Sequence, residues 1–536
     1  MGSADIPSLE EPRRAFRAAL AAEDAAGVLR SFVGRIGVVL SGGGARGAYE
    51  AGALLAFQDA AVPTHIIAAT SIGSVNAASF AAHADGLVGN AEPLVASWLH
   101  VSPRALGIEW TRYGWMVAGL IATSAGLGNL IWYLLTIAGF ELRLRYPALA
   151  WSALALAGAS VLLFYSQLPY VWFLIRSKWR GKVLEPVPSR LAVSIAANAL
   201  VGAFMVVSVT SLNLYTAFHT LLTRHPLAVA GVLAALAVLR ALQHRAAGRI
   251  SGAWERLFRF ALQPGLFKNF ERVRYLRDRV PMDRLRRSPI RVVVTATDLG
   301  AEVARHFANA TPEQLAADPG VDQAFVRDHV AAPEDMLGAI VASSALPITY
   351  EPMQLDGRTL MDGAVMGSQP IRPALRLGAD VLFLVLLEPS ARERGDIGTF
   401  VDVGTRTLGI LMHQHFRSDL GVLREVNAVC KGAAHQLRVP AEAIIIELGT
   451  RRMRYVKPFV IQPAQPLGLS IHDFGGPATP DAIAAGYRDA AEQIRAFVEY
   501  ARTARFDHER RVMRLMPTDL PALQAAARPS IGRIDR

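Results

Sequence analysis

Residues 36–54 read IGVVLSGGGARGAYEAGAL, which combines a short apolar strand, a glycine-rich turn and the start of an amphipathic helix. Pro63 ends that helix, and HIIAAT at 65–70 is a second apolar strand, after which another helix begins at Ser71. Strand, helix, strand and helix in so short a stretch are typical of a parallel sheet covered by helices. The stretch therefore predicts an α/β fold.

The chain of 536 residues is rich in apolar and poor in charged side chains, with 52% hydrophobic and 19% charged residues. This composition excludes a disordered chain, which is rich in charge and poor in apolar residues. It also suggests that part of the chain lies in lipid, because soluble proteins have about a quarter of charged residues. The net charge of +11 suits nucleic acid or an anionic membrane surface. The single cysteine, Cys430, excludes a disulfide framework and a cysteine-based zinc site.

Four apolar runs interrupt the α/β pattern, at 114–140, 147–175, 191–222 and 226–242. The first two contain no charged residue and the third contains only His219 as an ionisable group. These three exceed the roughly 20 apolar residues that cross a bilayer, whereas the fourth is shorter and contains Arg240. Large buried helices of a soluble protein are the alternative, but apolar runs of about 18 residues or more favour membrane spans. We therefore predict an all-α transmembrane insertion at 113–245.

The charges between the runs predict the orientation of this insertion. The loop at 176–190 contains five basic residues against one acidic residue, so the positive-inside rule places it in the cytoplasm. Four crossings would then leave both flanks of the insertion in the cytoplasm, and two crossings fit if some runs are re-entrant or interfacial. We expect an integral membrane protein with a cytoplasmic catalytic domain.

A basic segment follows the insertion. Residues 249–291 carry twelve Arg or Lys and four acidic residues, interleaved with aromatic side chains. We interpret this segment as a surface for anionic lipid, with a solvated helical face as the alternative. No nucleic-acid partner is expected, because no recognised binding motif accompanies the basic residues.

The glycine-rich turn is the first candidate for chemistry. Gly42, Gly43, Gly44 and Gly47 let the backbone turn sharply and expose N–H groups to an anion at a helix N-terminus. The turn also fits the G-x-G-x-x-G pattern of dinucleotide sites. Such sites require an acidic residue at the end of the next strand, where this chain has Thr70-Ser71 instead, so the dinucleotide alternative is disfavoured. A purely structural turn is the remaining alternative.

Ser71 is the second candidate. ATSIG at 69–73 nearly matches the nucleophile elbow G-x-S-x-G, in which a serine sits on a strained turn from strand to helix. Gly73 is as small as the elbow requires, and Ala69 is a mild departure. A serine that caps a helix is the common alternative. Because adjacent parallel strands would bring the glycine turn beside Ser71, the turn could hold an oxyanion while the serine attacks.

A nucleophilic serine needs a base. Asp362-Gly363 follows a hairpin predicted around Asp356-Gly357, and it is a better candidate than Asp298 because its small neighbours permit close backbone approach. An Asp-Gly pair is by itself usually only a turn signal. The rival is a Ser-His-Asp triad, for which five histidines follow in a suitable chain order. These are His413, His415, His435, His472 and His508.

Five segments together resemble the patatin-like phospholipases. They are SGGGARGAYEAGAL at 41–54, ATSIGSVNA at 69–77, ASSALP at 342–347, MDGAVMGSQPI at 361–371 and GAD at 378–380. The resemblance covers about 35–100 and 290–390, and it implies a three-layer α/β/α fold and hydrolysis of acyl esters in lipids. Ala69 in place of glycine and the long apolar insert depart from the family's pattern.

The resemblance also implies roles for particular residues. Ser71 would be the nucleophile of a Ser–Asp dyad, and Asp362 would be the base that takes its proton. The backbone of Gly42, Gly43 and Gly44 would form the oxyanion hole. Supporting roles would fall to Arg46, Gly47, Gly73 and Gly363. We expect no metal and no cofactor, because backbone donors would carry the negative charge.

We therefore predict a membrane-embedded carboxylic ester hydrolase whose partner is a membrane lipid. The alternative is a non-catalytic lipid-binding or scaffold protein of the same fold. If Ser71 and Asp362 meet, the two halves lie on one side of the membrane and the number of crossings must be even. The predicted regions are a helical leader (1–34), the first catalytic part (35–112), the insertion (113–245), the basic segment (246–290), the second catalytic part (291–390) and a mostly helical end (391–536).

Overall fold

The computed structural model describes residues 6–108, 267–389, 420–504 and 511–515, apart from positions 348, 368, 422 and 449–450. The chain divides into two units, Met1–Ile108 with Phe267–Arg536, and Glu109–Leu266. The predicted insertion at 113–245, with all four apolar runs, lies outside the described residues. Among the residues that are described, no helix is both long and apolar enough to cross a membrane.

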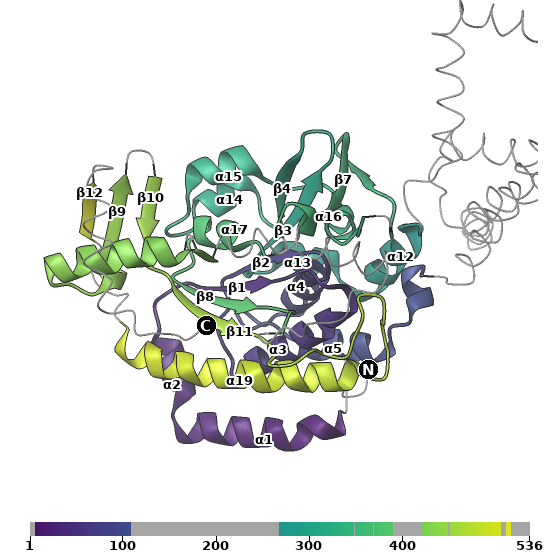
Figure 1. The fold of residues 1–536 in the computed structure, drawn as a ribbon, viewed down its shortest axis with the longest axis horizontal. Coiled ribbons are helices and arrows are strands. Elements are labelled where there is room, and N and C mark those ends of the chain that lie inside the picture. Colours follow the sequence, from purple (N-terminus) through teal and green to yellow (C-terminus); the bar gives the residue numbers. More distant parts are fainter. Residues whose placement is uncertain are drawn as a thin grey trace, which may run out of the picture. The chain divides into compact units, whose positions relative to one another are not determined.

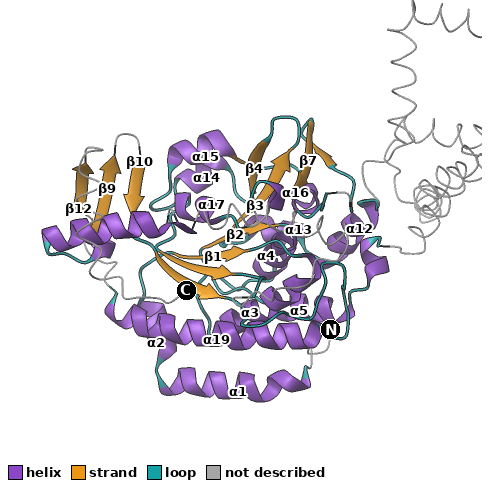
Figure 2. Ribbon diagram, in the orientation of Figure 1, coloured by secondary structure: helices purple, strands orange, loops and turns teal. Residues whose placement is uncertain are grey.

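A nine-stranded sheet forms the centre of the first unit (Figures 1 and 2). Its strands are β1 (Ile36–Leu40), β2 (Ile66–Thr70), β3 (Arg291–Asp298), β4 (Val303–Ala308), β5 (Val330–Ala331), β6 (Met353–Leu355), β7 (Arg358–Asp362), β8 (Val381–Val385) and β11 (Lys457–Ile461). The order is β11–β8–β1–β2–β3–β4–β5, with β7 beside β3 and β6 beside β7. From β11 to β3 all pairs are parallel, as the α/β prediction requires.

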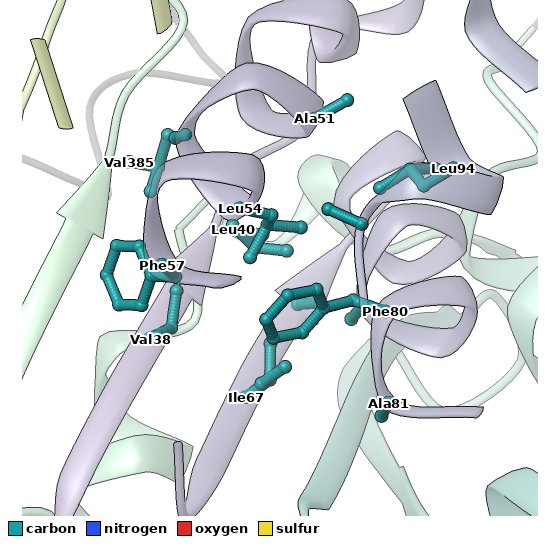
Figure 3. Packing of buried hydrophobic residues seen from close by; sticks show 14 of the residues in the cluster. Val38, Leu40, Ala51, Leu54, Phe57, Ile67, Phe80, Ala81, Leu94 and Val385 are labelled. Atoms are coloured by element: carbon teal, nitrogen blue, oxygen red, sulfur yellow. The ribbon is translucent and has the colours of Figure 1, made fainter. Parts of the chain in front are cut away.

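Helices cover both faces of the sheet. Along β1 and β2 successive side chains point to opposite faces, so that Val38 and Ile67 join one hydrophobic cluster whereas Val39 and Ala68 join another. Figure 3 shows part of the first cluster. Both central strands are buried along their whole length, which is why they read as continuous apolar runs.

The helices fall into two layers according to the cluster that they join. In the first layer lie α1 (Pro7–Ala22), α2 (Ala25–Ser31), α3 (Ala48–Asp59), α4 (Ile72–Ala82), α5 (Glu92–His100), α12 (Phe270–Arg279), α13 (Met282–Arg287), α16 (Met336–Ser343) and α19 (Thr479–Thr503). In the second lie α14 (Pro312–Ala316), α15 (Gln323–His329) and α17 (Ile371–Arg376). Short 3₁₀ turns are η1 (Gly44–Gly47), η2 (Pro103–Leu106), η3 (Gly363–Val365) and η4 (Ala441–Ala443).

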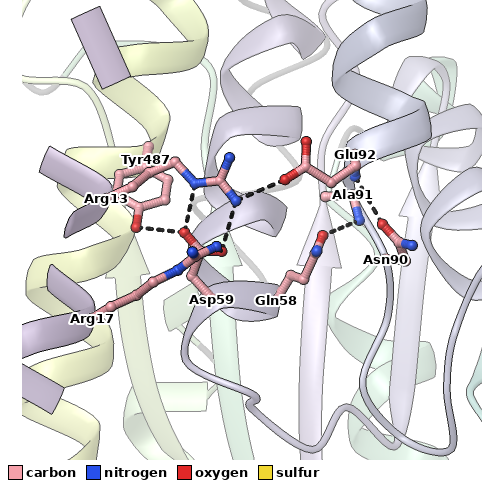
Figure 4. Close-up of polar contacts among 8 residues, drawn as sticks. All are labelled: Arg13, Arg17, Gln58, Asp59, Asn90, Ala91, Glu92 and Tyr487. Carbon is pink, nitrogen blue, oxygen red and sulfur yellow. Dashed lines mark hydrogen bonds and ion pairs between the residues drawn. The ribbon is translucent and has the colours of Figure 1, made fainter. Parts of the chain in front are cut away.

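The leader is held to the domain by a polar cluster (Figure 4). Arg13 of α1 donates two hydrogen bonds to the Asp59 carboxylate, at 2.8 and 2.9 Å, and one to Glu92 at 2.7 Å. Arg17 and Tyr487 also donate to Asp59. Burial alone would raise the pKa of Asp59, but these hydrogen bonds and the arginine charges outweigh it and lower the pKa.

The described part of the C-terminal region contains strands in addition to the predicted helices. Residues 423–437 and α19 are helical, but β11 joins the main sheet and β9 (Ile444–Leu448), β10 (Arg451–Arg454) and β12 (Arg511–Leu515) form a second sheet. These segments form strands because three consecutive isoleucines begin β9 and Phe-Val-Ile ends β11, and such residues favour strands. Because β11 pairs with β8, the main sheet extends beyond the predicted boundary at residue 390.

The described part of the basic segment packs on the domain. Leu276 of α12 and Leu285 of α13 are buried in the first cluster, whereas Arg284, Arg286 and Arg287 are exposed. The predicted contact of these arginines with anionic lipid stays a prediction.

Candidate active site

Ser71 occupies the turn between β2 and α4. Its backbone angles, φ 55° and ψ −128°, lie in a region that L-residues rarely adopt, which costs on the order of 1–3 kcal/mol. Such strain is typical of the nucleophile elbow, where it presents the hydroxyl at the end of the strand. The residue is only 7% exposed.

Small neighbours permit this turn. A Cβ on Gly73 would lie 2.8 Å from Leu40 Cβ and 2.9 Å from Leu40 O, so α4 could not approach β1 with any larger residue there. Ala69, where the elbow pattern has glycine, is accommodated within the sheet and fully buried.

Asp362 meets Ser71 because two strands converge on β3. Strand β2 runs parallel to β3 and ends with Thr70 opposite Thr295. Strand β7 runs antiparallel to β3 and ends with Asp362 opposite Ala296. Because β4 occupies the other edge of β3, β2 and β7 share one edge and their carboxyl ends abut. Residues 291 positions apart are thereby brought together.

The two side chains are in direct contact. Ser71 Oγ donates a hydrogen bond of 2.6 Å to Asp362 Oδ2, and the amide of Ala364 donates to Oδ1 at 2.8 Å. The Asp362 amide donates to Ala345 O at 3.1 Å. A Cβ on Gly363 would lie 2.1 Å from Thr295 O, so only glycine lets the chain turn away from β3 at this point.

Asp362 is fully buried, and this burial decides its protonation. Removal from water raises the pKa of the carboxyl to about 6, although the hydrogen bonds from Ser71 and Ala364 and the charge of Arg272 oppose the shift. A carboxyl with a pKa near 6 is ionised at neutral pH and remains basic enough to accept a proton from a serine during attack.

The glycine turn lies against Ser71. A Cβ on Gly42 would be 3.0 Å from Ser71 Cβ, which measures how closely the two loops pass. Gly44 has φ +59°, and a Cβ there would lie 2.2 Å from Ile471 O. Within the described residues, nothing accepts a hydrogen bond from the amides of Gly42, Gly43 or Gly44. Three adjacent N–H groups beside a buried hydroxyl can receive a negatively charged oxygen.

A buried polar network of α3, α4 and α5 supports the glycine turn. The sequence did not predict this network. Glu50 of α3 accepts hydrogen bonds from the Ser41 amide at 2.7 Å and from Asn76 Nδ2 at 2.8 Å. Asn76 also donates to Gly47 O and accepts from Trp98 Nε1. Burial raises the pKa of Glu50 to about 8 against these hydrogen bonds. A lone acidic residue in the otherwise apolar AYEAGALLAF helix was the available signal.

Arg46 and the loop between β11 and α19 hold the turn from above. Arg46 forms an ion pair with Glu388 at 2.5 Å and donates to Leu469 O at 3.2 Å. The Ala45 amide donates to Ile471 O at 3.0 Å. Arg46 thus connects the glycine turn to Glu388 and to this loop. The loop belongs to the C-terminal region, to which the sequence assigned no role.

Ser343 is a further residue that the sequence analysis did not single out, although it lies within the ASSALP motif. Its Oγ accepts the Ser71 amide at 3.0 Å and donates to Thr295 O at 2.6 Å. It therefore fixes the strained backbone of Ser71 to β3.

No histidine among the described residues is hydrogen bonded to Ser71 or Asp362. His472 lies 3.4 Å from Thr349 Oγ1, measured from Nε2, and His435 is exposed. The other three candidates of the triad reading, at 413, 415 and 508, lie outside the described residues.

Comparisons with known proteins found short relatives, a distant solved structure and a family. Two fungal relatives match short segments: the lysophospholipase nte1 of Aspergillus terreus is 47% identical over 57 residues, and the lysophospholipase NTE1 of Chaetomium globosum is 48% identical over 50 residues. The matched segments are 10% and 9% of this chain, and they span only 4% and 3% of those proteins. A solved structure, VipD from Legionella pneumophila, aligns with 86% of this chain and 67% of its own at 12% identity, with a TM-score of 0.28.

The family comparison is broader. The model of the patatin-like phospholipases matches residues 38–161 and 197–375, more than half of the chain. These ranges include the glycine turn, Ser71 and Asp362. The chain belongs to the patatin-like phospholipase family.

Proposed function

We propose that this protein is a serine acyl hydrolase that cleaves acyl esters of lipids with a Ser71–Asp362 dyad. The observation that carries the proposal is the hydrogen bond of 2.6 Å between Ser71 Oγ and Asp362 Oδ2 in a buried site. Two fungal relatives named lysophospholipases and the family assignment support a lipid ester as the substrate class.

In the first step, Asp362 takes the proton of Ser71 as Oγ attacks the acyl carbonyl carbon. The carbonyl oxygen becomes an oxyanion, which the amides of Gly43 and Gly44 stabilise. The loss of one such donor typically slows a reaction about 10²–10³-fold. When the ester bond breaks, Asp362 returns the proton to the leaving alcohol and the acyl group stays on Ser71.

In the second step, water replaces the alcohol. Asp362 takes a proton from the water as the water oxygen attacks the acyl-enzyme, and the same amides hold the second oxyanion. The proton passes to Ser71 Oγ as the acyl–oxygen bond breaks. The products are one alcohol and one carboxylic acid, and the enzyme is restored.

A fluorophosphonate probe tests this function directly, because it phosphonylates activated serines. The wild-type chain should be labelled at Ser71, and Ser71→Ala and Asp362→Asn should not be labelled. Ser79→Ala is the matched control, since Ser79 is a buried serine of α4, the helix that follows Ser71, and this variant should label normally. Asp298→Asn should also label, because Asp298 is paired with Arg305 and Arg358. An unlabelled but folded wild-type chain would favour the non-catalytic lipid-binding alternative.

We also propose that the apolar runs anchor the enzyme in a membrane, with its catalytic domain in the cytoplasm. The hydropathy of the runs at 114–140, 147–175 and 191–222 supports this location. Because residues before and after the insertion share one site, the number of crossings must be even. Tags at the two ends of the chain should show the same protease access in sealed vesicles, and opposite access would refute the scheme.

A further inference from the structure

Arg272 is an unusual residue of α12, because its guanidinium is buried. The residue is only 4% exposed. Its Nη2 donates hydrogen bonds to Val341 O at 2.6 Å and to Ser344 Oγ at 2.7 Å, and its Cζ lies 4.0 Å from the centre of the Tyr350 ring. Arg272 therefore binds the carboxyl end of α16, where helix carbonyls lack intrahelical partners.

The segment that Arg272 binds touches both members of the proposed dyad. Ser343 accepts the Ser71 amide at 3.0 Å, and Ala345 O accepts the Asp362 amide at 3.1 Å. Ser344, which contacts Arg272, lies between these two residues. Any shift of Ser344 would thus move the backbone partners of the nucleophile and of the base together.

The charge of Arg272 requires its own explanation. Its Nη1 is buried and has no hydrogen-bond partner among the described residues. A helix end can be capped by glycine or by an uncharged side chain, and burying a cation with an unpaired donor costs free energy that such caps avoid. A negative partner nearby would offset that cost. The charge of Arg272 acts on Asp362, where it lowers the pKa of the buried carboxyl against the effect of burial.

We propose that Arg272 is a positioning residue of the active site, which aligns Ser343 and Ala345 with the dyad and supplies positive charge to the Asp362 carboxylate. The proposal deepens the proposed function and rests on it. The residue touches no reacting atom, so its effect passes through Ser344 and through the electrostatic field.

Few other charged groups surround this arginine. Tyr350, whose ring it covers, is buried, and burial raises the pKa of its hydroxyl to about 12, so it stays neutral during catalysis. Glu351 also faces Arg272, but its carboxylate is paired with Lys268 at 2.9 Å. On β3, the strand that pairs with β7, Asp298 is engaged by two arginines, Arg305 and Arg358. Asp362 differs from these two carboxylates, because among the described residues it forms no ion pair.

The test measures the rate of fluorophosphonate labelling of Ser71 against pH for the full chain. In Arg272→Gln the acidic midpoint should move up, because removal of a nearby positive charge raises the pKa of a carboxyl. In Arg272→Lys the midpoint should stay close to that of the wild type while labelling slows several-fold, because the charge remains but the fork is lost. Arg274→Gln, on the exposed side of the same helix, should change neither quantity.

The outcomes separate the two levels of the proposal. A slower Arg272→Gln with an unchanged midpoint would reduce Arg272 to a structural cap and overturn the electrostatic role. If Arg272→Gln does not fold, Arg272→Lys provides the test. A Lys variant with the rate and the midpoint of the wild type would overturn the positioning role. A Lys variant with a shifted midpoint would overturn the electrostatic role. Absence of wild-type labelling at Ser71 would defeat the proposed function instead.

Discussion

Lowering the pH from 7 to 5 should slow the hydrolysis of a soluble short-chain ester about tenfold. The reason is the buried carboxyl of Asp362, whose pKa burial raises to about 6. Only the ionised carboxylate can accept the proton of Ser71. The ionised fraction is about nine tenths at pH 7 and about one tenth at pH 5, and kcat/KM should follow this fraction.

The contribution of Asp362 to stability has the opposite pH dependence to its contribution to activity. Because the folded-state pKa of Asp362 is raised, the folded chain holds this proton more tightly than the unfolded chain does. The contribution of this group to the free energy of unfolding is therefore fully present below about pH 4 and is lost as the pH rises through about 6. The expected activity should therefore rise over the same pH range in which this group ceases to stabilise the fold.

The assay is kcat/KM for a neutral soluble ester between pH 4.5 and 8, with circular dichroism at each pH to show that the chain stays folded. A soluble substrate avoids changes in the charge of a lipid surface. A midpoint near 4, the value of a solvated aspartate, would show that Asp362 is not desolvated in the active enzyme. A rate independent of pH would remove Asp362 from the role of base.

Two further changes test buried polar contacts, one beneath the glycine turn and one between the leader and the domain. Glu50→Leu should lower the free energy of unfolding by about 1–3 kcal/mol, because the Ser41 amide and Asn76 Nδ2 would lose their buried acceptor. It should also slow labelling of Ser71. Chemical denaturation measures the first effect, and unchanged stability would contradict it. Arg13→Met should lower the free energy of unfolding by about 1–3 kcal/mol, because it leaves the Asp59 carboxylate with fewer hydrogen-bond donors. The control Arg14→Met, at the exposed neighbouring position, should lower it by less than about 0.5 kcal/mol.

The parts of the site that the sequence predicted are those with local physical causes. The elbow at Ser71 needs a small residue two positions on, and Gly73 meets a steric limit set by Leu40. The hairpin before Asp362 is announced by Asp356-Gly357, both with positive φ, as a two-residue turn of this kind requires. Both turns can be predicted from the sequence because each depends on a few neighbouring residues.

The parts that the sequence did not predict depend on contacts between distant segments. Arg272 was interpreted as one basic residue among twelve, because nothing in its neighbours distinguishes a buried guanidinium from an exposed one. Ile471 meets the glycine turn through a backbone carbonyl, for which any residue type would serve. The strand β11 reaches the sheet from beyond residue 390, where the family resemblance ends.

The two chain segments that flank residues 109–266 contact the segment that leads to Asp362. Tyr350 donates a hydrogen bond to Leu106 O at 3.2 Å, and its neighbour Thr349 accepts one from the Phe267 amide at 2.8 Å. The last described residues before the unit 109–266 and the first after it therefore meet at one place on the catalytic domain. A chain that leaves and returns at one place can carry an insertion without disturbing the sheet. If residues 109–266 cross a bilayer, an even number of crossings returns the chain to this place, beside the segment from Thr349 to Asp362.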